Sequence, residues 1–226
     1  MVICRQPQEA AIADAPRYSL IARHYEACLA EHGDTAKGVD WPDPHEARLR
    51  YDVMLSMLPP PGATRPSLLD LGCGAGHMLA HMQEVGSWAH VAYHGADLSP
   101  VFIELCRTKF PGLPFVATDA IASPESLPMV DYTVLNGVFT VKRELEFEEM
   151  WGFVRQLLRA AWSRTRTALA FNVMSTQVDW ERTDLFHMPM DLLGAFLKSE
   201  LSRHFHIRHD YGLYEYTCFV YRAPRR

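Results

Sequence analysis

The stretch that decides the fold is Leu68-Leu69-Asp70-Leu71-Gly72-Cys73-Gly74-Ala75-Gly76-His77. An apolar run typical of a buried strand leads into three alternate glycines, and a helical pattern begins directly after them. Glycine permits a positive φ and lets the backbone approach a ligand closely. In a doubly wound sheet, this first strand-to-helix turn lies at the switch point where ligands bind. The stretch therefore predicts a ligand site at the first turn of an α/β sheet.

The rest of the chain extends this pattern in both directions. Two helices are expected before the motif, over residues 17–32 and from Pro44 to Leu58. The elements expected after it are helix 77–85, strand 91–97, helix 101–109, strands 113–119 and 131–137, helix 145–162, strand 168–173, helix 190–205 and two closing strands within 206–221. Repeated strand–helix–strand units predict a mostly parallel sheet covered by helices on both faces, and the closing strand pair predicts an antiparallel edge.

Composition restricts the classes of function. The net charge is -5 and no Lys/Arg run occurs, so the chain lacks the basic field that holds a nucleic-acid backbone. No apolar run approaches the roughly 20 residues that span a bilayer. The polar segment Met1–Ala15 excludes the apolar core of a signal peptide. Five widely spaced cysteines without a CxxC pair favour a reduced, cytoplasmic protein.

Three carboxylates indicate which ligand the glycine turn binds. A dinucleotide site needs G-x-G-x-x-G, whereas this chain has G-x-G-x-G preceded by Asp70. A carboxylate there disfavours a pyrophosphate and suits a cationic group such as an α-amino group or a sulfonium. Asp97 ends the second strand about 20 residues past the glycines, where an acid binds ribose hydroxyls. Asp119 ends the third strand, where it is expected near an adenine amino group.

This order of motifs resembles the class I S-adenosylmethionine (SAM)-dependent methyltransferases over about residues 65–222. The resemblance implies a three-layer sandwich with a Rossmann-like, seven-stranded, mostly parallel sheet in the order 3-2-1-4-5-7-6, in which strand seven is antiparallel. It implies one domain over 1–226, with 1–62 as an N-terminal cap of two helices. It also implies SAM as the bound nucleoside, held by Asp70, Gly72, Gly74, Gly76, Asp97, Leu98, Asp119, Ala120, Asn136 and Gly137.

A narrower resemblance, to a group of small bacterial methyltransferase-like proteins, covers nearly the whole chain. It rests on His32-Gly33, Lys37–Trp41, Gly137–Lys142, Phe171-Asn172, Val178–Trp180 and Tyr214–Thr217. Enzymes that cyclise SAM to azetidine-2-carboxylate are similar to this group. Many members have Ser-Gly-[IV]-Phe-Asn after strand four and Tyr before Val-Asp, whereas this chain has Asn136, Thr140 and Gln177. No catalytic role is therefore transferred from the group to these three positions.

Four residues are candidates for the catalytic step. Trp41 is either a cover over the cofactor or an ordinary packed aromatic. Phe139 is either a ring facing the sulfonium or core packing. Asn136, at the end of strand four, is expected beside the sulfonium. Tyr25 is a candidate base, together with His187, His209 and Asp179.

No metal is expected. His204 and His206 share one face of a strand, but His209 faces the other way. No cysteine or acidic residue lies near them at ligand spacing.

Three functions remain open. SAM carries its own leaving group, so the protein has to align it with a nucleophile and exclude water. The main hypothesis is methyl transfer to a small-molecule acceptor. The alternatives are a lyase that uses SAM alone and forms azetidine-2-carboxylate and methylthioadenosine, and a non-catalytic SAM-binding protein. The acceptor wall is expected from residues 177–189 or from the N-terminal helices. The expected partner is a small molecule or SAM alone, without nucleic acid or membrane, and a homodimer is left open.

Overall fold

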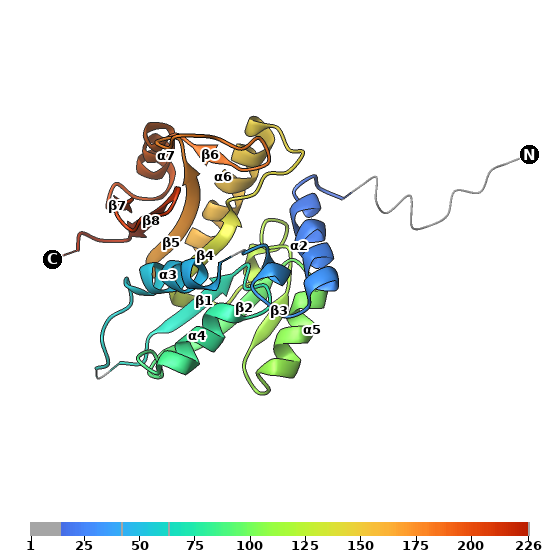
Figure 1. Cartoon of the computed structure of the whole chain (residues 1–226). Helices are drawn as coiled ribbons and strands as arrows, with labels where there is room; N and C mark the ends of the chain where they lie inside the picture. Colours follow the sequence, from blue (N-terminus) through green and yellow to red (C-terminus); the bar gives the residue numbers. More distant parts are fainter. Residues whose placement is uncertain (1–14, 42, 63, 226) are drawn as a thin grey trace, which may run out of the picture.

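A single sheet of eight strands forms the middle layer of the computed structural model, which describes residues 15–41, 43–62 and 64–225 (Figure 1). The order is β3-β2-β1-β4-β5-β8-β7, with β6 paired to β5. The strands are β1 (Ser67–Leu71), β2 (Ala92–Asp97), β3 (Phe115–Ala117), β4 (Val130–Phe139), β5 (Thr165–Ser175), β6 (His187–Met188), β7 (Phe205–Arg208) and β8 (Glu215–Tyr221).

This sheet confirms the expected order of the seven main strands, including the antiparallel seventh strand, and adds one short strand. β8 is antiparallel to both β5 and β7, so it lies inside the sheet and β7 forms the edge. β6 is an eighth strand of two residues, parallel to β5. A strand this short has no periodicity of its own, so only its pairing with β5 defines it.

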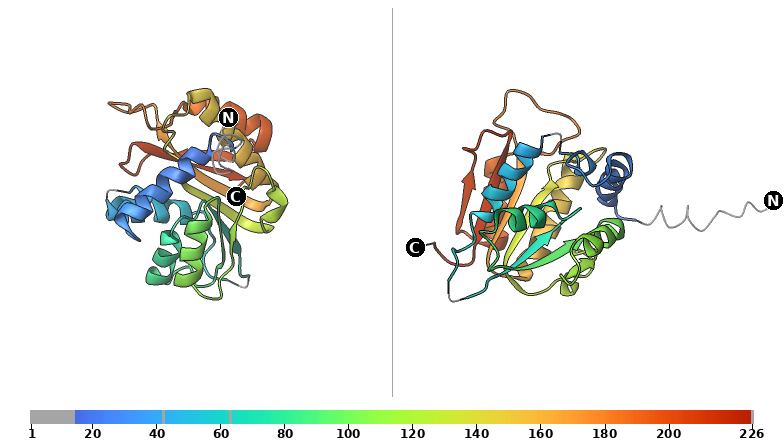
Figure 2. Two further views of the ribbon diagram at one scale, coloured as in Figure 1. Left: turned by 90° about the vertical axis from the view of Figure 1, so that its right-hand side faces the viewer. Right: turned by 60° about the horizontal axis from the view of Figure 1, so that its bottom comes forward.

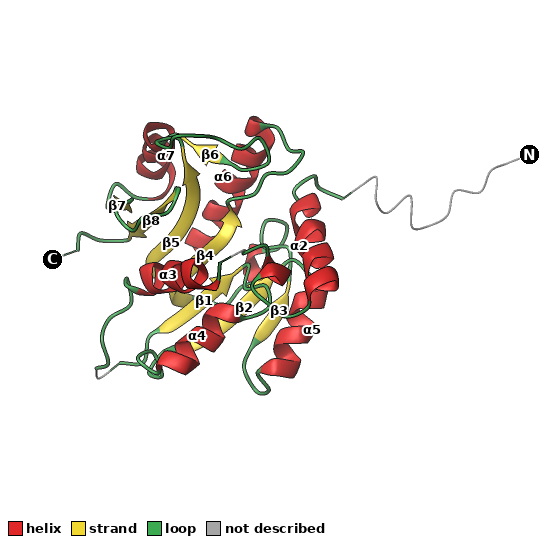
Figure 3. Cartoon of the chain, in the orientation of Figure 1, coloured by secondary structure: helices red, strands yellow, loops and turns green. Residues whose placement is uncertain are grey.

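Helices cover both faces of the sheet (Figure 3). They are α2 (Ser19–His32), η1 (Lys37–Val39), α3 (Pro44–Leu55), α4 (His77–Val85), α5 (Pro100–Lys109), η2 (Pro124–Ser126), α6 (Phe147–Ser163), α7 (Met190–Phe196) and the π-helical turn η3 (Leu197–Leu201). The helix expected over 190–205 was too long, because Phe205–Arg208 pairs with β8 instead. Tertiary pairing overrides the helical pattern of that segment.

Two apolar clusters lie on opposite sides of the sheet. One joins β-strand residues to α6 and α7, and the other joins them to α3, α4 and α5. The strongly amphipathic α6 begins at a capping box, in which Glu146 and Glu149 bond each other's backbone N–H groups. Figure 2 shows from two further directions that α2 packs beside the sheet and not within it.

The N-terminal prediction concerning Met1–Ala15 falls almost wholly outside the described residues. Within the described part of the chain, no helix combines the length and the apolar character that a membrane crossing requires.

The glycine turn between β1 and α4 has the conformation that the motif predicts. Gly72, Gly74 and Gly76 all have positive φ, at 81°, 49° and 72°. The N–H groups of Gly72 and Cys73 both donate to the carbonyl oxygen of Ala96, at 2.7 and 3.1 Å. These bonds hold the turn against the end of β2, so the first two strand ends form one surface.

Gly76→Ala tests how tightly this turn packs on α5. A Cβ at Gly76 would lie 2.7 Å from a Phe110 ring carbon and 3.2 Å from Cys106 Sγ, whereas a Cβ at Gly86, whose φ is 76°, meets nothing within 4 Å. We expect Gly86→Ala to cost about 1 kcal/mol of unfolding free energy from backbone strain alone. Gly76→Ala should cost about 2–4 kcal/mol, because overpacking adds to that strain. Urea denaturation measures both, and equal losses would contradict the packing at Gly76.

Candidate functional site

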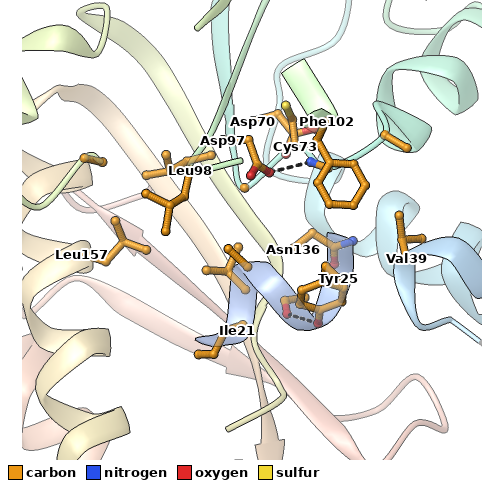
Figure 4. A pocket seen from close by; sticks show the side chains of 18 of the residues that line it. Ile21, Tyr25, Val39, Asp70, Cys73, Asp97, Leu98, Phe102, Asn136 and Leu157 are labelled. Carbon is orange, nitrogen blue, oxygen red and sulfur yellow. Dashed lines mark hydrogen bonds between the residues drawn. The ribbon is translucent and has the colours of Figure 1, made fainter. Parts of the chain in front are cut away.

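A cavity lies at the carboxyl ends of β1, β2 and β4, and its empty space, including the part that opens to solvent, is about 1070 Å³. Its floor is the glycine turn, and its roof comes from α2 and from the loop after η1. Figure 4 shows Asp70, Asp97 and Cys73 on one side of the cavity, opposite Ile21 and Tyr25 of α2. Parallel strands direct their carboxyl ends to one edge, which places the ends of three strands in the same cavity.

Three carboxylates line this cavity, those of Asp70, Asp97 and Asp119. No lysine or arginine occurs among its described lining residues. Such a surface repels phosphate groups and attracts a cation. The charge therefore supports the prediction that Asp70 disfavours a dinucleotide.

Asp97 is held rigidly by backbone amides. Its Oδ2 accepts the N–H of Gly74 at 2.8 Å, and its Oδ1 accepts the N–H of Ser99 at 2.8 Å. Burial raises the pKa of this carboxyl, and the nearby Glu26 adds to the effect, while the two amide bonds oppose it. Asp97 therefore connects the glycine turn to the start of α5, with its remaining lone pairs at the cavity.

Asp70 is the most deeply buried of the three carboxylates. Its side chain is 2% exposed, and its Oδ2 accepts the hydroxyl of Tyr93 at 2.8 Å. Burial raises its pKa to about 7, against the opposing hydrogen bond from Tyr93, and Asp97 adds to the rise. A cation bound beside Asp70 would favour the ionised form and lower that pKa.

Asp119 already has partners for both of its oxygens. Oδ2 accepts the hydroxyl of Tyr18 at 2.7 Å, and Oδ1 accepts the N–H groups of Ile121 and Ala122 at 3.0 and 3.2 Å. The carboxylate thus caps a turn and also connects α2 to the end of β3. Tyr18 in turn stacks on Phe153 with the ring centroids 4.9 Å apart.

Nine of the ten predicted cofactor-binding residues line the cavity: Asp70, Gly72, Gly74, Asp97, Leu98, Asp119, Ala120, Asn136 and Gly137. Gly76 does not, which corrects its expected position. Its α-carbon faces Phe110 and Cys106 of the α5 region, and it forms the N-cap of α4. The third glycine therefore permits close helix packing and does not contact the cavity.

Three of the four catalytic candidates, Trp41, Tyr25 and Asn136, line the cavity. Phe139 does not, and its expected position facing a sulfonium is corrected. It is fully buried and packs edge-on against Phe153 and Phe171. Side chains alternate along a strand, so Val138 faces the cavity and Phe139 faces α6.

Among the four candidate bases, only Tyr25 lines the cavity. Its hydroxyl donates to the carbonyl oxygen of Gly137 at 3.3 Å, and burial raises its pKa far above neutral pH. Tyr25 therefore donates a hydrogen bond to the wall of the cavity. His187 instead bonds the carbonyl oxygen of Ser175 through Nδ1 at 2.7 Å, outside this cavity.

The acceptor wall was expected from residues 177–189 or from the N-terminal helices, and the two helices α2 and α3 do line the cavity. No residue of 177–189 lines it, because β6 pairs with β5 and Leu185 bridges Val141. The glycine and strand-end motifs do not predict these other lining residues: Tyr18, Ile21, Ala22, Val39, Tyr51, Phe102, Phe153 and Leu157. The helical spacing of α2 was visible in the sequence, but not the surface that it covers.

One group of side chains with metal-ligand chemistry lies beside the roof. His24, Cys28 and Asp40 bring one ligand atom each to within 4.8 Å of one another. His24 Nε2 is 2.8 Å from Asp40 Oδ2 and 3.8 Å from Cys28 Sγ. Sequence spacing alone points to His204, His206 and His209 and not to this group, because Asp40 joins His24 and Cys28 only through the fold.

Known proteins share this architecture. A family model described as a methyltransferase domain matches residues 69–161. The Mycobacterium tuberculosis protein Rv1506c, named as a methyltransferase, is 29% identical over 159 residues, which is 70% of this chain and 93% of the relative.

Solved structures extend the likeness across the whole fold. Magnesium protoporphyrin IX methyltransferase from Synechocystis PCC 6803, with bound SAM, has a TM-score of 0.62 at 12% identity, covering 93% of this chain and 99% of that one. Human N-acetylserotonin methyltransferase, in complex with SAM, has a TM-score of 0.57 at 14% identity, covering 99% of this chain and 61% of that one. At these identities the structures show a shared fold. The matched family model adds that residues 69–161 of this chain resemble a methyltransferase domain.

Proposed function

We propose that the protein binds SAM in this cavity and transfers its methyl group to a small-molecule acceptor. The observation that carries the proposal is the pair Asp70 and Asp97, at the ends of neighbouring parallel strands on either side of the glycine turn. One carboxylate fits the α-ammonium group of SAM, and the other fits its ribose hydroxyls.

The remaining lining residues fit the other parts of the cofactor. Leu98 and Ala120 offer an apolar surface for the adenine ring beside Asp119. Because the Asp119 carboxylate accepts three hydrogen bonds within the protein, one more than Asp97, we assign that residue to shaping the adenine site through its turn. Asn136 and Gly137 lie where the sulfonium would be, and Trp41 covers them. Of these, Asn136 Oδ1 is buried without a hydrogen-bond partner among the described residues, so it is free to accept one from a ligand.

The acceptor that this wall favours is small and largely apolar. Ile21, Ala22 and Val39 close the cavity over the glycine turn. Because burial keeps the proton on Tyr25, we assign no base role to this residue, and a nucleophile that needs little help from a base, such as a neutral nitrogen, fits the wall. The two structural neighbours named above are methyltransferases named for small molecules, which supports this class of acceptor.

The partly enclosed cavity also fits the lyase alternative. There the neutral amine of SAM attacks its own γ-carbon, the N–Cγ bond forms, and the Cγ–S bond breaks to release methylthioadenosine. The ammonium must first lose a proton, and Asp70, with a pKa of about 7, could accept it. This observation keeps the lyase as the second candidate.

Product analysis separates the two reactions. The purified protein is incubated with SAM alone, and with SAM plus a panel of small nitrogen nucleophiles, and the products are identified by mass spectrometry. We expect adenosylhomocysteine only when an acceptor is present. Methylthioadenosine with a cyclic amino acid would establish the lyase instead. SAM binding without any product would support a non-catalytic binding protein.

Asp97→Ala should weaken SAM binding by about 1–3 kcal/mol, because charge-assisted hydrogen bonds to the ribose are lost. Isothermal titration calorimetry measures the change in Kd. The matched control is Asp131→Ala, since Asp131 also accepts a backbone N–H, from Ser67 at 2.9 Å, but lies at the opposite end of the sheet. An unchanged Kd for Asp97→Ala, or an equal loss in the control, would show that the ribose is placed wrongly.

The raised pKa of Asp70 predicts how binding and stability depend on pH. Below pH 7 the carboxyl is protonated, so the attraction for the ammonium is lost and the Kd for SAM should rise by up to about tenfold per pH unit. Without ligand, the folded state holds this proton more tightly than the unfolded state, whose carboxyl has its ordinary pKa of 3.8. Asp70 should therefore lower stability as pH rises from about 4 to 7.

Asp70→Asn removes the titrating group and retains an acceptor for Tyr93. Calorimetry and urea denaturation across pH 5–8 should give flatter profiles for this variant than for the wild type. Identical profiles would mean that Asp70 does not face the ammonium.

A further inference from the structure

A closed ring of contacts lies behind the wall that Trp41 and Gly137 form. The N–H of Gly137 donates to Asn172 Oδ1 at 2.7 Å, and Asn172 Nδ2 donates to Glu215 Oε1 at 2.9 Å. Glu215 Oε2 accepts Arg50 Nε at 2.8 Å. Each of these residues comes from a different element, namely β4, β5, β8 and α3.

The ring closes through the indole of Trp41. The guanidinium carbon of Arg50 lies 4.1 Å from the centroid of the Trp41 ring. The other edge of the indole packs on Gly137, where a Cβ would lie only 2.7 Å from Trp41 Cζ2. Arg50 thus orients the ring from one side, and the absence of a side chain at Gly137 lets the ring approach from the other.

Hydrogen bonds hold both the N–H and the carbonyl oxygen of Gly137. Its φ is 79°, a conformation that glycine adopts easily. Its N–H is held by Asn172, and its carbonyl oxygen accepts the hydroxyls of Thr140 at 3.0 Å and Tyr25 at 3.3 Å. Gly137 is therefore fixed in the cavity wall by three side chains, two of which, Tyr25 and Asn172, are far from it in the sequence.

The burial of the ring argues for a role beyond stability. Arg50, Asn172 and Glu215 are 8%, 0% and 1% exposed. A buried ion pair is weak evidence for stability, since desolvation of both charges offsets most of their attraction. What such a network supplies is a single defined geometry, provided that its members are hydrogen-bonded. Here the geometry that it defines is the position of Trp41 and Gly137.

We propose that Asn172, Glu215 and Arg50 are positioning residues, which hold Trp41 and the Gly137 peptide as one wall of the SAM site. None of the three lines the cavity, so they act through Trp41 and Gly137. The inference rests on the proposed function, because SAM is the ligand whose binding the wall governs. It also gives a role to Phe171-Asn172 and Tyr214–Thr217, the segments of the narrower resemblance that had none.

Exchanging the amide of Asn172 with the carboxylate of Glu215 tests the proposal. Asn172→Asp alone places two carboxylates against each other, and Glu215→Gln alone leaves Arg50 with only the half-exposed Glu46, at 3.4 Å, as a counter-charge. In the double variant, Gly137 N–H can donate to Asp, the amide of Gln can donate to the other Asp oxygen, and Arg50 can donate to the Gln oxygen. Every hydrogen bond of the ring can form again, with the charge moved by one residue.

Calorimetry with adenosylhomocysteine, an unreactive relative of SAM, measures binding by folded protein well below each Tm. We expect each single variant to bind roughly 10- to 100-fold more weakly, since small displacements of a binding wall have effects of this size. The double variant should recover most of the loss. Singles that bind as the wild type does, or a double variant that is as weak as the singles, would overturn the proposal.

A buried pair of hydrogen-bonded threonines outside the ring serves as the matched control. Thr133 and Thr165 share a hydrogen bond of 2.6 Å between β4 and β5, and neither lines the cavity. Thr133→Val should lower Tm and leave the Kd unchanged. An equal loss of affinity in this control would show that Asn172 and Glu215 act only through general stability.

Two further measurements keep the outcomes separate. If the wild type binds neither adenosylhomocysteine nor SAM, the proposed function fails, whereas normal wild-type binding without the rescue pattern defeats the positioning role alone. If a single variant does not fold, Trp41→Leu replaces it, since Trp41 lies at the half-buried end of the ring. That variant should bind at least tenfold more weakly, and unchanged affinity would contradict the proposal.

Discussion

The hydrogen bonds between the glycine turn and the end of β2 are the constraint on which the site depends. The N–H groups of Gly72 and Cys73 share the carbonyl oxygen of Ala96, and the N–H of Gly74 donates to Asp97. These bonds require a backbone that turns through positive φ at alternate residues, which glycine allows. They bring the ends of two parallel strands together, so that Asp70 and Asp97 face one cavity.

The electrostatics of the cavity follow from that geometry. Two carboxylates lie on neighbouring strands in a partly closed space, and burial raises the pKa of both. Hydrogen bonds stabilise the two carboxylates against their mutual repulsion: the N–H of Gly74 donates to Asp97, and the hydroxyl of Tyr93 donates to Asp70. A cationic ligand relieves the remaining cost, whereas a pyrophosphate would increase it. The same arrangement therefore holds the fold together and selects the ligand.

The opposite wall is built on a different principle. At the glycine turn, the N–H of Gly74 donates to Asp97, which lies only 23 residues further along the chain. At Gly137, the amide is held by Asn172, and the chain of bonds continues through Glu215 to Arg50, which is 165 residues away from Glu215. Strand β8, antiparallel and late in the chain, is thereby connected to a site formed by the first four strands. The wall can form only when the whole sheet is assembled.

The sequence by itself determined the fold class and nearly all of the predicted positions that line the cavity, whereas the strand order was implied by the family resemblance of its motifs. The fold class and the lining positions follow from local patterns and from a topological rule: parallel strand ends meet at one edge, whatever the details of packing. Tertiary structure alone decided that Gly76 packs on Phe110, that Phe139 faces α6, and that α2 and not residues 177–189 covers the cavity. It also decided the ring through Arg50, Asn172 and Glu215. The reason is that the direction in which a side chain points depends on the distant surface against which its helix or strand packs. The hydrophobic periodicity of a segment does not show which surface that is.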